Sequence, residues 1–252
     1  MPIKTAIIPY LDGLEPESEA SGVVNTIVKV SSPDGPKLIG TNTDILGIQN
    51  ALLNQLRSQH QGLSISLRAL YPKGVGAGAI IGGGATTRSA VYALTKLGLH
   101  PIYLVNRASD EVKAVQDAYP GLVQAGSLIH LDYPDKVEDL LQVAQPDSPR
   151  ILMIVGAIPA IPPVTKADSL PFPAKRLFLE MAYKPRITPM LKVAMAHGWD
   201  GIDGTNAVVE QGFAQQRMWL RGDASADIGS DPAILGPFIE QKARNLIAKM
   251  GE

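Results

Sequence analysis

The sequence predicts an α/β protein: a doubly wound parallel sheet joined to a partial, smaller α/β unit. Three observations predict this fold class. Short apolar runs alternate with helical patterns in the middle of the chain, glycines cluster at one strand-to-helix junction, and the last part holds helical patterns without a strand. Strands that alternate with helices form parallel sheets joined by right-handed crossovers.

The composition excludes several classes of function. Of 252 residues, 45% are hydrophobic and 19% charged, and the formal net charge is -1. This balance gives no reason to expect nucleic acid or an anionic membrane as a partner. There is no cysteine, and the four histidines are scattered, so we expect neither disulfides nor a metal site. No apolar run reaches the roughly 18 residues of a membrane span, so we expect a soluble, cytoplasmic protein.

The first segment, residues 1–57, predicts one or two strands and a helix. The strands are expected over 23–30 and 36–40, and the helix over 44–56. Four apolar residues recur on one stripe of that helix: Ile45, Ile48, Leu52 and Leu56. A polar, glycine-containing connector follows before the main sheet.

The middle segment, residues 70–204, carries the alternation that predicts the parallel sheet. Strands are expected over 77–83, 100–106, 127–131, 150–155 and 175–183. Helices are expected over 86–98, 109–121 and 136–144. Gly98 stands where a glycine would end the first of these helices, and Ser109 opens the second.

The last segment, residues 205–252, predicts helices over 205–220 and 232–250. Because no strand lies between them, they cannot extend the sheet. We therefore expect them to pack with the N-terminal segment as a second, smaller domain.

The sharpest local pattern is IIGGGATTRSA, residues 80–90, between a predicted strand and a predicted helix. Glycines there allow a tight turn that brings backbone N–H groups and a helix N-terminus against a pyrophosphate. The spacing Gly82-x-Gly84-x-x-Thr87 lacks the third glycine of the dinucleotide fingerprint. The pattern favours dinucleotide binding, with an ordinary glycine-rich turn as the alternative.

The tip of the next predicted strand bears on the choice of cofactor. An acid at this tip would bind the adenosine ribose hydroxyls and favour NAD. Asn106 and Arg107 stand there instead, and a guanidinium suits a 2′-phosphate, so NADP is favoured. The alternative for Arg107 is a solvated charge at a strand end. Asp110 nearby leaves NAD as an alternative cofactor.

Five stretches together form a recognisable pattern. They are MPIK, SGVVNTIV, GTNTDILGI, IGGGATTRSAVYAL followed by VNR, and EMAYKPRITPML with GWDGIDGTNAVVEQGFAQQRMW. In these stretches the chain resembles the shikimate dehydrogenase family, especially the version at the C-terminus of the pentafunctional arom polypeptide and the related quinate dehydrogenases. The resemblance implies a Rossmann-like domain and NADPH-dependent reduction of 3-dehydroshikimate to shikimate, in aromatic amino acid biosynthesis. Quinate-active members use the dehydroquinate and quinate pair.

The resemblance also implies roles for individual residues. Lys4 and Asp44 correspond to the catalytic proton-transfer pair, and Asn25, Tyr183 and Gln211 to substrate-binding residues. The cofactor positions are Gly82, Gly83, Gly84, Ala85, Asn106, Arg107, Met181 and Gly204. Taken without the resemblance, Asp44 is a first-turn helix acid.

The sequence departs from the family pattern in three respects. Ala85 replaces the last glycine of the GAGG turn. Ala108 replaces a threonine whose hydroxyl could bind the 2′-phosphate, and the loss of this hydroxyl should weaken the preference for NADP.

The third departure is that the stretch that precedes MPIK in the family is absent from this sequence. We therefore expect a truncated substrate-binding domain with Lys4 at a poorly held strand end, which binds NADPH but reduces 3-dehydroshikimate poorly. The alternative is a catalytically impaired or regulatory homologue, similar to quinate-pathway repressor domains. Shikimate versus quinate and the oligomeric state are not predicted.

Overall fold

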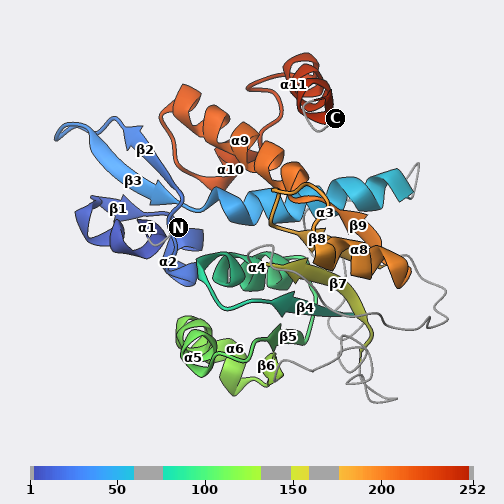
Figure 1. Ribbon diagram of the computed structural model, residues 1–252. Coiled ribbons are helices and arrows are strands. Elements are labelled where there is room, and N and C mark those ends of the chain that lie inside the picture. The colour runs from blue at the N-terminus through green and yellow to red at the C-terminus, as the bar shows by residue number, and fades with distance from the viewer. Residues whose placement is uncertain (1–2, 60–75, 132–148, 159–175, 250–252) are drawn as a thin grey trace.

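The computed structural model describes residues 3–59, 76–131, 149–158 and 176–249 (Figure 1). Two sheets organise these residues: a six-stranded sheet of order β6-β5-β4-β7-β8-β9 and a three-stranded sheet of order β1-β3-β2. Helices flank the larger sheet on both faces. This architecture confirms the predicted fold class, a doubly wound α/β protein.

The six-stranded sheet is parallel throughout. Its strands are β4 (Ala77–Ile81), β5 (Ile102–Val105), β6 (Leu128–Leu131), β7 (Ile151–Gly156), β8 (Leu177–Glu180) and β9 (Asp200–Ile202). The chain winds from β4 through β5 to β6, and β7, β8 and β9 continue on the other side of β4. The direction of winding reverses between β4 and β7. In open α/β sheets, ligands bind outside the carboxyl ends of the strands at such a reversal.

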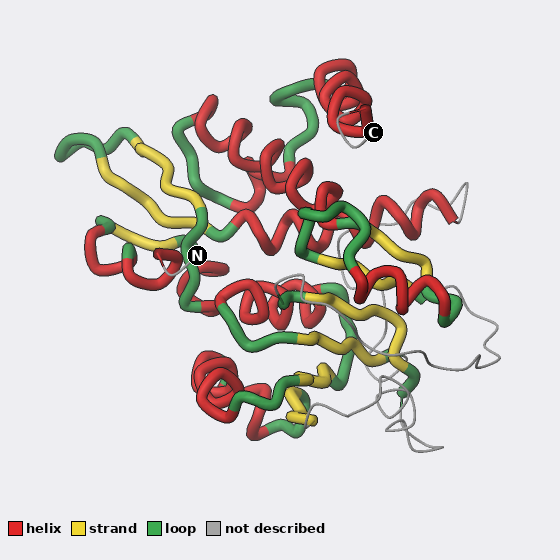
Figure 2. The backbone as a smooth tube through the Cα atoms, in the orientation of Figure 1, coloured by secondary structure: helices red, strands yellow, loops and turns green. Residues whose placement is uncertain are grey.

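Helices lie on both sides of the larger sheet (Figure 2), and alternate residues of its strands belong to two separate cores. On one face, Ile80 and Leu104 join a core with α3 (Thr43–Gln59), α4 (Ala85–Lys96) and α5 (Ser109–Ala118). On the other face, Ile81 and Val105 pack in a second core with α8 (Pro189–Ala196). A strand buried on both faces reads as a continuous apolar run, which explains why these strands are visible in the sequence.

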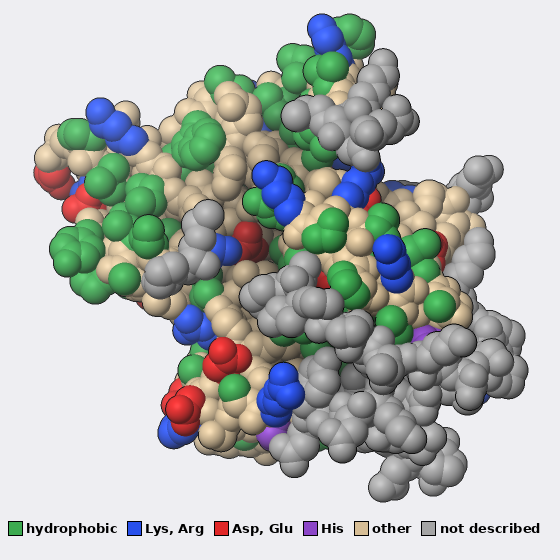
Figure 3. All heavy atoms as spheres, viewed as in Figure 1, with side chains coloured by type: hydrophobic (Ala, Val, Ile, Leu, Met, Phe, Trp, Pro, Cys, Tyr) green, Lys and Arg blue, Asp and Glu red, His purple; other side chains and the backbone are tan. Residues whose placement is uncertain are grey.

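The smaller sheet consists of β1 (Gly13–Leu14), β2 (Thr26–Val30) and β3 (Lys37–Thr41). The chain reaches it through the helical turns α1 (Ile3–Ala6) and η1 (Ile8–Tyr10), and α2 (Pro16–Ser21) connects β1 to β2. Hydrophobic side chains gather on the surface over this sheet (Figure 3). Exposed hydrophobic residues of this region are Ile3, Tyr10, Ile27 and Leu38.

The C-terminal helices are α9 (Gly204–Arg221), α10 (Ala226–Ser230) and α11 (Pro237–Lys249). Helix α9 lies along α3, as Figure 1 shows, and the two helices share the largest helix–helix contact of the described chain. A separate core joins them to the small sheet through Val28, Leu46, Ala214, Met218 and Ala224. Within the described ranges, no helix is long and apolar enough to cross a membrane.

The structure differs from the sequence expectations at several elements. Lys4 lies in the helical turn α1 rather than at a strand end. Helix α8 and strand β9 were not predicted, since one is short and the other has only three residues. The last helix starts at Pro237 instead of residue 232, because Gly236 has φ +79° and interrupts the helix. The helix expected over 136–144 lies outside the described residues.

Candidate active site

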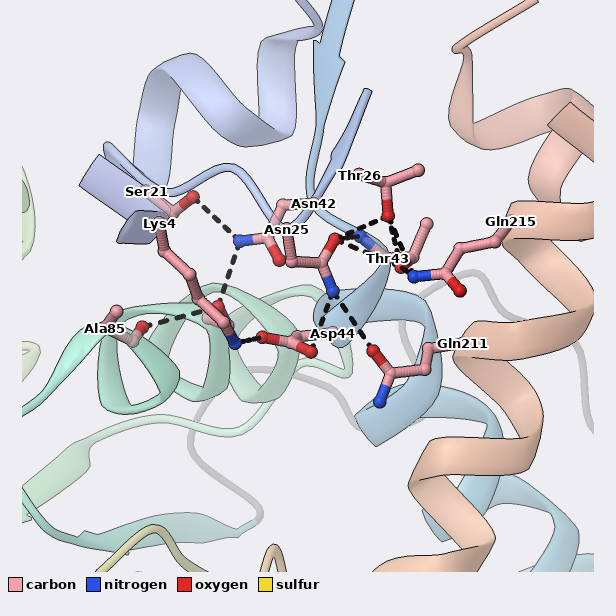
Figure 4. Close-up of polar contacts among 11 residues, drawn as sticks. Lys4, Ser21, Asn25, Thr26, Asn42, Thr43, Asp44, Ala85, Gln211 and Gln215 are labelled. Atoms are coloured by element: carbon pink, nitrogen blue, oxygen red, sulfur yellow. Dashed lines mark hydrogen bonds and ion pairs between the residues drawn. The ribbon is translucent and has the colours of Figure 1, made fainter. Parts of the chain in front are cut away.

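Lys4 is held at both its backbone and its side chain. Its carbonyl oxygen accepts a hydrogen bond of 2.8 Å from the Val24 N–H. Its ammonium group forms an ion pair with Asp44 (Figure 4), and the two side chains are 18% and 5% exposed. Sequence reasoning expected only a few terminal residues to hold this lysine. The structure instead ties it to the segment just before β2 and to α3.

Asp44 lies in the first turn of α3, directly after β3. One carboxylate oxygen contacts the Lys4 ammonium group, and the other accepts a hydrogen bond of 2.8 Å from the side-chain amide of Asn25. Because Asp44 is buried, both contacts are needed to compensate the lost hydration of the carboxylate. The first-turn position also places its charge near the positive end of the α3 dipole. Asp44 therefore serves both as a first-turn acid of α3 and as the ion-pair partner of Lys4.

The side-chain amide of Asn25 is fixed in one orientation (Figure 4). Its oxygen accepts hydrogen bonds from the Thr43 N–H and the Thr26 hydroxyl, each 2.8 Å long. Since a backbone N–H can only donate, this oxygen must face it, and the amide nitrogen must face Asp44 and Gln211. The nitrogen donates to the Gln211 side-chain oxygen at 3.1 Å. Asn25 thus links β2, α3 and α9.

Helix α9 brings two glutamines to this network, one helical turn apart. Gln211 meets Asn25, and Gln215 donates to the hydroxyls of Thr26 and Thr43 at 3.0 and 3.2 Å. The helices approach closely because α3 has glycine at position 47. A Cβ there would lie 2.7 Å from the Ala207 carbonyl oxygen and 3.2 Å from the Gln211 Cβ.

A cleft of about 610 Å³ opens beside Lys4. It lies at the carboxyl ends of β4 and β7, where the strand order reverses, and is also lined by Gly83, Gly84 and Ala85 from the turn after β4 and by Met181 after β8. The proposed proton-transfer residue and the glycine turn therefore face the same cavity. A cavity of this size can hold a drug-sized or cofactor-sized ligand.

Two of the three glycines of the turn are required by their surroundings, and the third begins the helix. Gly82 has φ +142°, and a Cβ would lie 2.8 Å from the Ala157 carbonyl oxygen. A Cβ at Gly83 would lie 2.1 Å from the Asn106 amide nitrogen. Gly84 precedes α4 as its N-cap and is exposed, with open space around it. The turn therefore presents bare backbone and a helix N-terminus to the cleft, which suits a pyrophosphate.

The tip of β5 holds the residues predicted to choose the cofactor. Asn106 is buried; its amide nitrogen donates to Glu111 at 2.7 Å, and its oxygen accepts from the Ala108 N–H at 2.9 Å. Arg107 is exposed and is not part of the cleft lining, whereas Glu111 is. Glu111 was not singled out from the sequence.

Other predicted site residues also lie outside the cleft lining: Asn25, Asp44, Gln211, Gly82, Asn106, Tyr183 and Gly204. Tyr183 is 47% exposed, next to Ala182, which does line the cleft. Gly204 is buried, and a Cβ there would lie 2.7 to 2.9 Å from the carbonyl oxygens of residues 180–182. Its place is thus the junction between α9 and the loop after β8.

Sequence reasoning also missed Arg88, Thr43 and Gln215. Arg88 lines the cleft from the first turns of α4, and burial lowers the pKa of its guanidinium below the ordinary value. A signal for each was present: Arg88 lies in the glycine stretch, Thr43 in GTNTD, and Gln215 one helical turn after Gln211.

No family model matches the chain. Among solved structures, a chain from S. pombe described as dehydroquinate dehydratase and shikimate dehydrogenase is 30% identical, with a TM-score of 0.64 over 91% of this chain. The resemblance to shikimate and quinate dehydrogenases is confirmed. Quinate dehydrogenase from Corynebacterium glutamicum, in complex with NAD, is 20% identical, with a TM-score of 0.64 over 91% of this chain. Shikimate 5-dehydrogenase from Thermus thermophilus, in complex with NADP(H) and shikimate, is 24% identical, with a TM-score of 0.62 over 97% of this chain.

This chain covers different shares of the dehydrogenase chains to which it is similar. This chain spans 41% of the S. pombe chain, 74% of the quinate dehydrogenase and 76% of the Thermus enzyme. The similarity shows that this chain shares the fold of these dehydrogenases.

Proposed function

We propose that the chain is an NADP-dependent oxidoreductase that interconverts 3-dehydroshikimate and shikimate, or dehydroquinate and quinate. The observation that carries this proposal is that Lys4, paired with Asp44, and the glycine turn line one cleft. Structures similar to this one contain shikimate with NADP(H), or NAD in a quinate dehydrogenase, which supports the substrate class and the kind of cofactor.

The cleft fits a dinucleotide by its shape and its donors. The backbone of Gly83 and Gly84 and the N-terminus of α4 line the cavity, so the N–H groups at the start of this helix suit a pyrophosphate. Arg88 adds a positive charge on the same wall. The nicotinamide, when bound, supplies or accepts a hydride. Met181 lines the cleft and offers an apolar, adaptable surface to its ring.

Lys4 and Asp44 handle the proton that accompanies hydride transfer. When a ketone receives hydride at carbon, negative charge develops on its oxygen, and a positioned ammonium group can donate a proton there. Asp44 keeps the Lys4 ammonium group at the cleft, and the Asn25 bond holds Asp44 in turn. In the reverse direction, neutral Lys4 would accept the hydroxyl proton.

Neutral polar groups next to this pair can orient a polyhydroxylated ring. The Asn25 amide and the Gln211 side chain lie next to Asp44 and supply both donors and acceptors. Tyr183 would join them from the loop after β8. We infer that NADP is favoured over NAD, since the Arg107 guanidinium at the tip of β5 suits a 2′-phosphate.

Steady-state kinetics test the proposed chemistry. Lys4→Ala and Asp44→Asn should lower kcat with 3-dehydroshikimate or dehydroquinate by about 10²–10⁴-fold, because each removes the positioned proton donor or its holder. NADPH binding, followed by nicotinamide fluorescence, should persist in both variants. Lys113→Ala is the matched control, since Lys113 is an exposed lysine paired only with Asp117 among the described residues.

The outcomes separate the proposal from its alternative. Unchanged kcat in Lys4→Ala would exclude the proton-transfer role. Tight dinucleotide binding by the unaltered protein, without turnover of either substrate pair, would instead indicate the catalytically impaired or regulatory homologue.

A further inference from the structure

The charges on the cleft wall are unevenly distributed. Among the described residues that line the cleft, the ionisable ones are Lys4, Arg88 and Glu111. Lys4 is paired with Asp44 on the substrate side, and Arg88 lies at the start of α4. Glu111 is the acid of this set, and the proposed chemistry gives it no task.

Glu111 lies directly against the glycine turn. A Cβ built on Gly83 would lie 2.3 Å from a carboxylate oxygen of Glu111 and 2.4 Å from its Cβ. The same oxygen accepts the 2.7 Å hydrogen bond from Asn106 at the tip of β5. The carboxylate therefore lies between the ends of β4 and β5. In a sheet of this winding, that is where the adenosine ribose of a dinucleotide lies.

We propose that Glu111 is a specificity-determining residue that limits the preference for NADP and keeps NAD acceptable. This inference rests on the proposed dinucleotide function of the cleft. A carboxylate accepts hydrogen bonds from the two ribose hydroxyls of NAD. It repels the 2′-phosphate of NADP, which carries up to two negative charges, and so offsets the attraction of Arg107.

An ordinary helix-terminus role does not account for this placement. Acids in the first turn of a helix are favoured by its dipole, and α5 has two of them, Asp110 and Glu111. Only Glu111 of the two lines the cleft and bonds to Asn106. Asp110 therefore provides a matched control with the same charge, the same helix and the adjacent position.

The test compares dinucleotide binding in the substrate-free protein, so it does not depend on turnover. Dissociation constants for NADPH and NADH, measured by nicotinamide fluorescence, give a selectivity ratio. Glu111→Gln keeps an oxygen that can accept from Asn106 but removes the charge. It should tighten NADPH binding relative to NADH by about tenfold, the effect of one charge a few ångströms from a phosphate at the protein surface. Asp110→Asn should change the ratio by less than about twofold.

A second probe isolates the phosphate. Adenosine 2′,5′-bisphosphate and ADP differ in the group that Glu111 is inferred to oppose, and their affinity ratio should shift in parallel with the dinucleotide ratio. An unchanged ratio in Glu111→Gln, or an equal shift in Asp110→Asn, would overturn the inference while leaving the proposed function intact. Failure of the unaltered protein to bind either dinucleotide would contradict both.

Discussion

At the scale of single residues, Glu180 is a buried acid that the proposed chemistry does not use. It ends β8 and is 1% exposed. One carboxylate oxygen accepts from the Ala182 N–H at 3.2 Å, and the other from the Thr188 hydroxyl at 2.9 Å. Burial raises the pKa of Glu180 above its ordinary value of 4.5, and these hydrogen bonds offset part of the rise. Glu180 therefore anchors the loop that carries Met181 and Ala182 to the cleft.

This pKa shift makes a contribution to stability that depends on pH. The folded protein holds the Glu180 proton more tightly than the unfolded chain does, so the contribution is complete below the unfolded pKa. It is lost as the pH rises through the higher folded pKa. Glu180→Gln removes the titration, while its amide can still accept from Ala182 and donate to Thr188. The free energy of unfolding of this variant, relative to the unaltered protein, should increase as the pH rises from 4.5 through the raised pKa of the folded state.

Urea denaturation across that range measures the effect. Glu19→Gln, at an exposed position of α2, makes the same charge change without burial and should show a much smaller trend. A flat difference for Glu180→Gln would mean that the buried carboxyl group does not titrate differently in the folded state.

At the scale of elements, the crossing of α3 and α9 assembles the substrate side of the site. Asp44 and Gly47 lie one turn apart on α3. Gln211 of α9 packs against Gly47 and accepts a hydrogen bond from Asn25, which also donates to Asp44. With no side chain at Gly47, the backbone of α9 approaches closely enough for Gln211 to reach Asn25. Glycine inside a helix costs about 1 kcal/mol relative to alanine, so its presence here is explained by the close packing.

Gly47→Ala should therefore destabilise the protein in spite of its better helix propensity. The added methyl group would meet the Ala207 carbonyl oxygen at 2.7 Å, and forcing the helices apart should cost about 1–3 kcal/mol of unfolding free energy. Gly212→Ala on α9 is the control, because a Cβ there meets nothing within 4 Å. It should be neutral or stabilising by up to about 1 kcal/mol. Thermal and urea denaturation check both, and a stabilised Gly47→Ala would show that α9 has room to shift.

The elements that the sequence predicted well are those with strong periodicity. Helices α3 and α4 carry regular apolar stripes, and β4, β5 and β7 are continuous apolar runs. Local pattern failed where tertiary contact decides the conformation. The α1 turn around Lys4 is four residues long with none buried. It is therefore too short to show a pattern of apolar residues that would predict a helix.

At the scale of the whole molecule, Asn42 ties the N-terminal part of the chain to the helix after the glycine turn. It is 2% exposed, and its amide nitrogen donates to the Ser21 hydroxyl at 3.1 Å and to the Ser89 hydroxyl at 2.9 Å. Ser21 ends α2, and Ser89 lies on α4. One side chain thus joins the end of α2 to α4, whose first turn lines the cleft.

A double-mutant cycle measures this bridge. Asn42→Ala should lower the unfolding free energy by about 1–3 kcal/mol, because buried hydrogen bonds and packing are lost. In the double variant with Ser89→Ala, the loss of unfolding free energy should be about 1 kcal/mol smaller than the sum of the two single losses, because both changes break the same hydrogen bond. Additive losses would indicate that Asn42 and Ser89 act independently.

The sequence predicted which residues belong to the candidate site, but it did not predict how their side chains are arranged. Lys4, Asn25, Asp44 and Gln211 were selected by resemblance to a family, and the structure places them in one network. Periodicity alone would have left Asp44 as a helix-terminus acid. The cleft position of Glu111 depends on how α5 returns to the glycine turn, and no local pattern encodes that contact.

Helix α9 also links the loop after β8, which borders the cleft, to the network around Asp44. Its first residue, Gly204, rests on the backbone of residues 180–182, and seven residues later Gln211 reaches Asn25. The two contacts are therefore about 10 Å apart along the helix axis. Because the Gly204 backbone packs so closely on the loop that carries Met181, a displacement of that loop would require the start of α9 to move with it. The loop beside the cleft and the partner of Asn25 thus belong to one packed unit.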